Sequence, residues 1–192
     1  MGFTSPSEGW RSTEFLMNRL AQYGLILGSL SLLGVLTHMV PHDMGISTVG
    51  GVGMLAAAYL PPRLLFAPVF LTLFIVDAVH GFYALPAIGL VYLGHIAAAY
   101  AVYPTLQNVR VATVLGASVA SAITFYLVSN IAPMVMGYYP TTLEGWVACY
   151  LNGLPFLLRG VVANLLFGCL FFGLIALTGA SFAHRIASTQ RH

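Results

Sequence analysis

Long apolar segments follow one another along the chain, and charged residues separate them at only a few points. A helix that crosses the hydrocarbon core of a bilayer needs about 20 mostly apolar residues. The gaps between charges predict six such helices, over about 20–40, 46–60, 62–79, 85–103, 111–131 and 155–177. The alternative for the short second and third helices is a shallow hairpin that turns at Pro61-Pro62-Arg63. The pattern predicts an all-α, polytopic membrane protein with a single membrane domain over 1–192, in which the bundle covers 20–178 and short tails cover 1–19 and 179–192.

The segment between the last two apolar runs has a helical pattern of its own. Thr141 and Glu144 have the spacing of a capping box, with Thr141 as the N-cap residue. Apolar residues then recur at helical spacing and form one face, at Leu143, Trp146, Val147, Tyr150, Leu151 and Leu154. We expect a separate amphipathic helix over about 141–153, which either anchors the chain at the membrane interface or forms a lid or wall of a pocket.

Composition narrows the class of protein. The 192 residues include 7 basic and 5 acidic ones, so that 6% of the chain is charged and 59% is hydrophobic. An ordinary soluble domain has roughly 25% charged residues. The composition excludes a soluble globular protein and a disordered chain, and the surroundings must be membrane lipid. A net charge of +2 is too small to indicate nucleic acid as a partner.

The arginines predict the orientation in the membrane. With six spans and a cytoplasmic N-terminus, only Arg159 is external, and the other six are cytoplasmic, at positions 11, 19, 63, 110, 185 and 191. Positively charged residues concentrate in cytoplasmic loops. We therefore expect a multi-pass protein of the cell (inner) membrane with both termini in the cytoplasm. A five-span arrangement would instead place the last two arginines outside.

This topology gathers most of the other polar side chains near the external face. Ionisable groups within spans are costly and usually face a partner or a wet cavity. Aromatic side chains suit a flat ring ligand, although they also suit the ordinary interfacial belt. The candidate substrate-binding residues are His42, Asp77, His80, Tyr83, Asn130, Tyr139, Glu144, Trp146, Tyr150, Asn152, Arg159 and Asn164.

Several of these candidates also have a structural interpretation. Asp77 and His80 are three apart on one helix, so they could form a ligand-binding or proton-relay pair, or only a local helix-end hydrogen bond. Arg159 could bind a carboxylate or phosphate of a substrate, or it could pair with Asp77 or Glu144. Asn130 and Asn164 could contact a ligand or hydrogen-bond a neighbouring helix.

Histidines offer a different chemistry. His38, His42 and His80 together could hold a metal or cofactor, although Pro41 interrupts the helix between the first two. His95 lies in the middle of the fourth apolar segment, where it is either a packed histidine or a further ligand. The alternative function from these residues is a membrane haem- or metal-binding protein.

The chain has one contact site for another helix and no motif for catalysis. Gly24 and Gly28 are four apart in the first apolar segment, and this spacing lets a second helix of the same chain or of another subunit approach closely. No HExxH, GxSxG or Walker A motif is placed for catalysis, so we expect no enzyme activity and no use of ATP by the chain alone. A third function is then a non-catalytic assembly subunit.

Short motifs over about residues 20–175 give the chain a family resemblance. They are Pro41-His42, the small-residue segment 47–55, Asp77 with Gly81-Phe82, Tyr139-Pro140-Thr141-Thr142, Cys149-Tyr150 and Leu154-Pro155-Phe156. With them the chain resembles a bacterial six-span membrane family of unknown function, which is similar in fold to the S components of energy-coupling-factor (ECF) transporters.

S components are small subunits that capture vitamins or metal ions from the external side. The resemblance implies an S-component-like bundle that takes up a small vitamin-like molecule and requires no cofactor. It also implies, as partners, an ECF-type transmembrane coupling subunit and ATPases, which would dock at Gly24 and Gly28. Some relatives bind cobalamin without such a module, so a cobalt corrin is one ligand that the resemblance suggests, with His80 or His42 as the ligand of cobalt.

Overall fold

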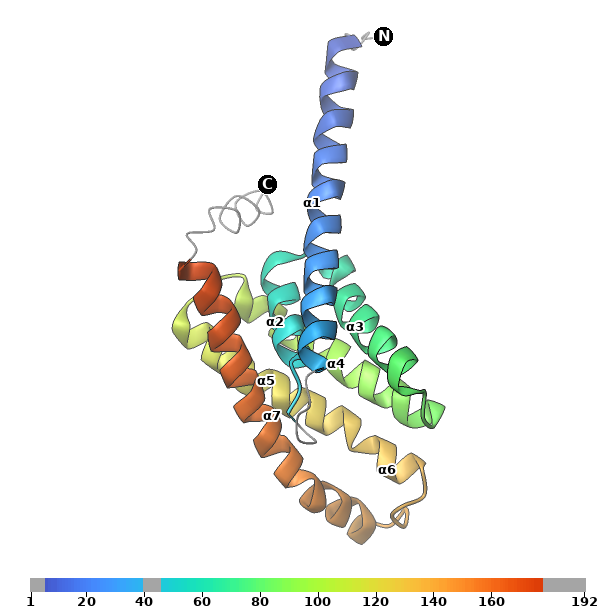
Figure 1. The fold of residues 1–192 in the computed structure, drawn as a ribbon. Coiled ribbons are helices and arrows are strands. Elements are labelled where there is room, and N and C mark those ends of the chain that lie inside the picture. Colours follow the sequence, from blue (N-terminus) through green and yellow to red (C-terminus); the bar gives the residue numbers. More distant parts are fainter. Residues whose placement is uncertain (1–5, 40–45, 178–192) are drawn as a thin grey trace, which may run out of the picture.

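The computed structural model of the chain describes residues 6–39 and 46–177, which form an all-helical bundle (Figure 1). The predicted all-α fold is confirmed for this part of the chain. A short 3-10 helix, η1 (Pro62–Leu64), precedes α3. The helices are α1 (Pro6–His38), α2 (Val49–Tyr59), α3 (Phe66–His80), α4 (Leu85–Leu106), α5 (Val111–Ser129), α6 (Ile131–Val135) and α7 (Leu143–Leu177). His42 and the predicted tail over 179–192 lie outside the described residues.

Five of the described segments are long and apolar enough to cross a membrane. They are Met17–His38, Pro62–His80, Leu85–Leu106, Val111–Val135 and Leu143–Leu177. Each coincides with a predicted span, and the turn between the second and third apolar segments lies at Pro61 as expected. Within the predicted tail over 1–19, residues 6–19 are helical, because α1 begins at Pro6 and runs without a break into the first candidate span.

The second predicted span is a short core helix. α2 has 11 residues, so its length is about 16 Å, whereas a bilayer's hydrocarbon core is about 30 Å thick. Every residue from Val49 to Ala58 is buried. Small residues account for this burial, because glycines and alanines let neighbouring helices approach α2 from several sides.

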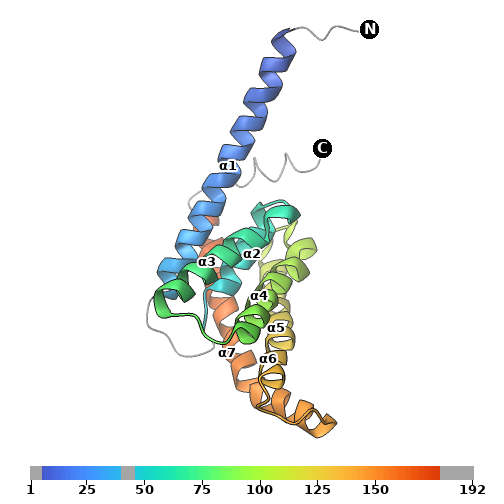
Figure 2. The same cartoon turned by 90° about the vertical axis from the view of Figure 1, so that its right-hand side faces the viewer.

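The chain reverses direction at each main helix from α1 to α5 and again at α7, as both views show (Figures 1 and 2). The start of α1, the end of α7 and the turns 60–65 and 107–110 lie toward one end of the bundle. We call this the arginine end, because its two turns contain Arg63 and Arg110. The connections 81–84 and 136–142 lie at the opposite end, which we call the loop end.

The predicted amphipathic helix over 141–153 is the first part of α7. This helix has 35 residues and continues through Pro155, so its length is about 52 Å. The capping residue is Thr142, whose hydroxyl accepts a hydrogen bond from the Gly145 N–H at 3.2 Å. The predicted N-cap at Thr141 and the separate helix are therefore wrong. Pro155 cannot donate to the preceding turn, and the axis of α7 bends in its N-terminal part (Figures 1 and 2).

A polar cluster joins α2, α5 and α7 inside the bundle. The side-chain amide of Asn164 donates to the main-chain carbonyl of Ser118 at 3.2 Å. The Ser118 hydroxyl is shared between the main-chain carbonyls of Asn164, at 3.1 Å, and Val114, at 2.8 Å. A Cβ added to Gly50 would lie 2.0 Å from Asn164 Oδ1. Asn164 therefore binds neighbouring helices together, and only glycine fits beside it on α2.

Substitution of Gly50 by alanine tests this packing. Gly50→Ala is expected to destabilise the protein by about 1–3 kcal/mol, because the new methyl group displaces the Asn164 amide from Ser118. Gly116→Ala is the matched control, because an added Cβ there has no atom within 4 Å and alanine favours the helix by about 0.5–1 kcal/mol. Thermal unfolding in detergent compares the two variants, and equal melting temperatures would contradict the proposed contact.

Candidate functional site

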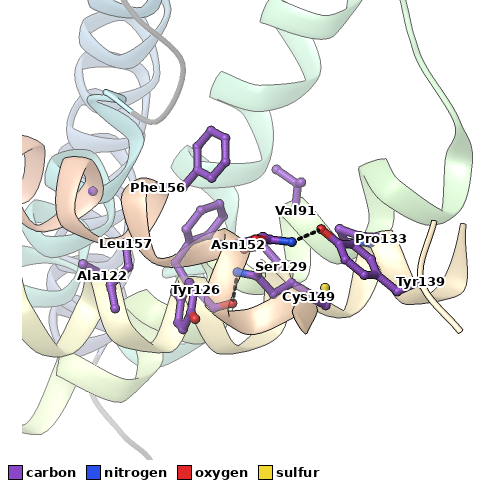
Figure 3. A pocket seen from close by; sticks show the side chains of 14 residues that line it. Val91, Ala122, Tyr126, Ser129, Pro133, Tyr139, Cys149, Asn152, Phe156 and Leu157 are labelled. Atoms are coloured by element: carbon purple, nitrogen blue, oxygen red, sulfur yellow. Dashed lines mark hydrogen bonds between the residues drawn. The ribbon is translucent and has the colours of Figure 1, made fainter. Parts of the chain in front are cut away.

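A pocket of about 360 Å³ lies between α4, α5, α6 and α7, and its lining includes one residue of the connection 136–142 (Figure 3). This volume is at the lower end of the range for small-molecule sites, about 300–1,000 Å³. The lining residues are Val91, Ala122, Phe125, Tyr126, Ser129, Asn130, Pro133, Tyr139, Cys149, Asn152, Gly153, Phe156, Leu157 and Gly160. Helical spacing explains the set, since residues three or four apart share one face of α5 or α7.

Hydrogen bonds between α5 and α7 hold the wall of the pocket. The Tyr126 hydroxyl donates to the Tyr150 carbonyl, and the Tyr150 hydroxyl donates to the Leu127 carbonyl at 2.7 Å. The Cys149 thiol donates to the Asn130 carbonyl at 3.3 Å. These hydrogen bonds join α7 to α5 and to the start of α6 beside the pocket.

The two asparagine amides of the lining each use one donor on the protein. Asn130 Nδ2 donates to the Tyr126 carbonyl at 2.8 Å. Asn152 Nδ2 donates to the Tyr139 hydroxyl at 3.1 Å, as Figure 3 shows. Gly153 lets α7 pass close to the first amide, because a Cβ there would lie 2.3 Å from Asn130 Oδ1. The network determines which way each amide group is oriented.

The structure thus brings together three of the predicted site residues in the pocket, namely Asn130, Tyr139 and Asn152. Tyr150 contributes its backbone carbonyl to the wall, and its ring lies 5.5 Å from that of Tyr126 and 6.3 Å from that of Trp146. The Trp146 side chain is exposed and does not line the pocket.

Asp77 and His80 do not form the predicted pair. Asp77 Oδ2 accepts a hydrogen bond from the Tyr92 hydroxyl at 2.7 Å, and His80 Nδ1 lies 3.0 Å from the Val76 carbonyl of its own helix. Neither residue lines the pocket. Burial raises the pKa of the Tyr83 phenol, and the nearby charge of Asp77 adds to the rise. Asp77, His80 and Tyr83 form part of a second polar group, where α3 ends and α4 begins.

The remaining polar candidates lie outside the pocket lining. The Arg159 guanidinium is 5.9 Å from the ring centre of Phe156, which lines the pocket, but the arginine itself is exposed. Glu144 is exposed in the first turn of α7. Asn164 belongs to the core cluster described above.

Gly24 and Gly28 lie on an open face of α1. An added Cβ at either glycine has no atom within 4 Å among the described residues. The predicted close approach of a second helix of the same chain is therefore not made by this part of the chain.

Histidines form no metal centre in the described part of the chain, where no three His, Cys, Asp or Glu side chains are grouped to hold an ion. His95 stacks on Phe125, with 4.0 Å between ring centres. His38 Nδ1 lies 3.5 Å from the Ser47 hydroxyl. His42 lies outside the described residues, so the predicted set of His38, His42 and His80 stays a prediction.

Sequence reasoning missed the apolar and small members of the pocket. Tyr126, Ser129 and Cys149 were hidden in apolar runs, and Gly153 and Gly160 carry no side-chain chemistry. One signal was present: polar or small residues recur on one face of α7, at Cys149, Asn152, Gly153 and Gly160. That stripe indicates a face turned away from lipid.

Fold and site together define a helical bundle of the membrane type with a small-molecule-sized pocket between α4, α5, α6 and α7. The chain belongs to the family of unknown function DUF6580, which matches residues 18–187. The matched range contains the whole pocket and the core cluster. No curated protein and no solved structure matches the chain. Membership of a family of unknown function is thereby confirmed, and the likeness to S components stays a prediction.

Removal of the Tyr92 hydroxyl tests the second polar group. Tyr92→Phe is expected to lower the stability by about 1–3 kcal/mol, because the substitution takes away the described hydrogen-bond donor of Asp77 Oδ2. Tyr138→Phe is the matched control, because Tyr138 is 72% exposed. Thermal unfolding in detergent is the measurement, and a Tyr92→Phe protein as stable as the control would show that the contact contributes nothing.

Proposed function

We propose that this protein binds a small molecule in the pocket between α5 and α7 and takes it up across the membrane, as an S-component-type capture protein. The observation that carries the proposal is the pocket itself. It has the volume of a small-molecule site, and it contains three residues that sequence reasoning selected for ligand binding, Asn130, Tyr139 and Asn152.

The arrangement of the connections supports uptake from the loop end. Arg63 and Arg110 occupy the turns of the arginine end, and positively charged turns favour the cytoplasmic side. The protein then lies in the cell (inner) membrane with its loop end facing outward. Both termini lie on the cytoplasmic side. α2 takes the place of the second of six spans, because it carries the chain back through the bundle although it is short.

The connection 136–142 supplies a moving part. It is not helical, it carries Tyr139, and it joins α6 to α7 beside the pocket. Loops rearrange more readily than packed helices. Opening of this connection admits the ligand, and a later change in the packing of α5 against α7 exposes the ligand to the other side. No covalent chemistry is needed.

Partners follow from the same proposal. The open face of α1 at Gly24 and Gly28 suits a membrane coupling subunit, with ATPases attached to it, of the kind that S components use. The ligand is a vitamin-sized molecule. A cobalt corrin has less support, because no histidine lines the pocket to ligate cobalt.

A leucine in the pocket tests ligand binding. Gly160 lines the pocket, and an added Cβ would meet only the Ala122 Cβ, at 3.9 Å. Gly160→Leu is therefore expected to fold and to fill the pocket. Native mass spectrometry of protein purified from its own host is expected to show a bound small molecule on the parent and at least a tenfold smaller fraction bound on Gly160→Leu.

The control for this experiment is Gly173→Leu, on the same helix. An added Cβ at Gly173 has no atom within 4 Å, and Gly173 is not part of the lining. It is expected to retain the small molecule. A parent protein without any bound molecule, or equal retention by the two leucine variants, would remove the support for a binding function.

Single cysteines test the proposed orientation. In a Cys149→Ser, Cys169→Ser background, Tyr138→Cys at the loop end is expected to react with a membrane-impermeant maleimide on intact cells. Asn108→Cys at the arginine end is expected to react only after the membrane is permeabilised. The reverse pattern of labelling would show that the arginine end is external.

A further inference from the structure

The lining of the pocket carries no charged side chain. None of its 14 residues is Asp, Glu, Lys, Arg or His. An ion bound in such a site loses part of its hydration and finds no opposite charge on the lining, which is unfavourable although Asn152 and Phe156 remain exposed. The absence of charge in the lining therefore disfavours ionised ligands.

Polar capacity in the pocket is instead that of amides and hydroxyls. Asn130 and Asn152 each use one N–H on the protein, and among the described residues no donor is paired with either Oδ1. The Tyr139 hydroxyl accepts from Asn152, so its own proton is free to be donated. The Ser129 hydroxyl also belongs to the lining. Acceptors and donors thus lie side by side, which matches a ligand edge with both N–H and C=O groups.

Aromatic rings form much of the remaining wall. Phe125, Tyr126 and Phe156 line the pocket together with Tyr139. Flat rings pack well against such side chains, in stacked or edge-to-face geometry. The pocket combines these rings with polar groups that are few and directional, as in sites that recognise a ring by its edge.

We propose that the ligand is an uncharged, planar ring that carries a carboxamide- or lactam-type edge. This inference rests on the proposed function and specifies the chemical class of its substrate. Asn152 and Tyr139 bind the polar edge of the ring, and the aromatic side chains hold its faces. Arg159 lies one residue before Gly160, but it does not line the pocket and takes no part in recognition.

Probes of equal shape and different charge test the inference. Benzamide, benzoate and benzamidinium differ in charge on one ring, and nicotinamide and nicotinate form a second pair. At millimolar concentration in detergent, we expect benzamide and nicotinamide to raise the melting temperature of the purified protein by roughly 2 °C or more, because a ligand that binds only the folded state stabilises it. Benzoate, nicotinate and benzamidinium are expected to produce no shift.

A charge placed in the pocket should change this preference. Asn152→Asp is expected to raise at least tenfold the benzamide concentration that gives half of the maximal shift. It is also expected to create a shift with benzamidinium, because the new carboxylate pairs with the amidinium. Asn108→Asp at the arginine end is the matched control and is expected to behave like the parent. Arg159→Gln is expected to leave every shift unchanged.

Three outcomes would overturn the inference. Charged probes that shift the parent more than neutral ones would do so, and so would a benzoate shift that Arg159→Gln abolishes, since Arg159 would then recognise an anion. In both cases the proposed function survives if Gly160→Leu removes the shift. The absence of a melting-temperature shift with every probe also overturns the inference that the ligand is uncharged. The proposed function is then tested separately, by the small molecule that the Gly160→Leu and Gly173→Leu variants retain.

Discussion

The burial of α2 on all sides is the constraint on which the rest of the structure depends. An 11-residue helix is too short to meet water at both ends of a bilayer, so its backbone and side chains must be enclosed by other helices. Enclosure requires small residues at the contacts. Gly50 faces Asn164, Gly51 faces Phe171, and Gly53 packs against Ala99 and Val69. Through these contacts α2 meets α7, α4 and α3, and the surrounding helices take their places around it.

The α5–α7 pair connects this core to the pocket. At one level Ser118 and Asn164 close the space between the two helices with reciprocal hydrogen bonds. Nearer the loop end, Tyr126 and Cys149 again join the helices. Between apolar helices in a lipid surrounding, close packing and hydrogen bonds of this kind hold the bundle together, because apolar surface alone gives little preference for protein over lipid. The pocket lies beside these contacts and is lined by residues of both helices.

Two groups of polar side chains at the loop end have different surroundings. Asp77 is held by Tyr92 at the ends of α3 and α4, while the amides of Asn130 and Asn152 lie across the bundle among aromatic rings. The first group carries a carboxyl, and the second carries no charge. Polar residues that the sequence predicts together on one face therefore divide into separate groups, and the uncharged amides are the ones that line the pocket between α5 and α7.

The sequence by itself determined that the protein is all-helical, that it suits a membrane, where five long helices lie, and that Asn130, Tyr139 and Asn152 are candidate ligand contacts. These conclusions depend on the length and composition of single segments, which the order of residues specifies directly. Only the tertiary structure decided that α2 is a buried core helix, that α7 is continuous from Leu143, and that Asn164 packs against Gly50. It also separated Asp77 from His80 and left Arg159 outside the pocket. Such distinctions depend on which helices meet and how they are rotated, and hydropathy along one helix carries no information about either.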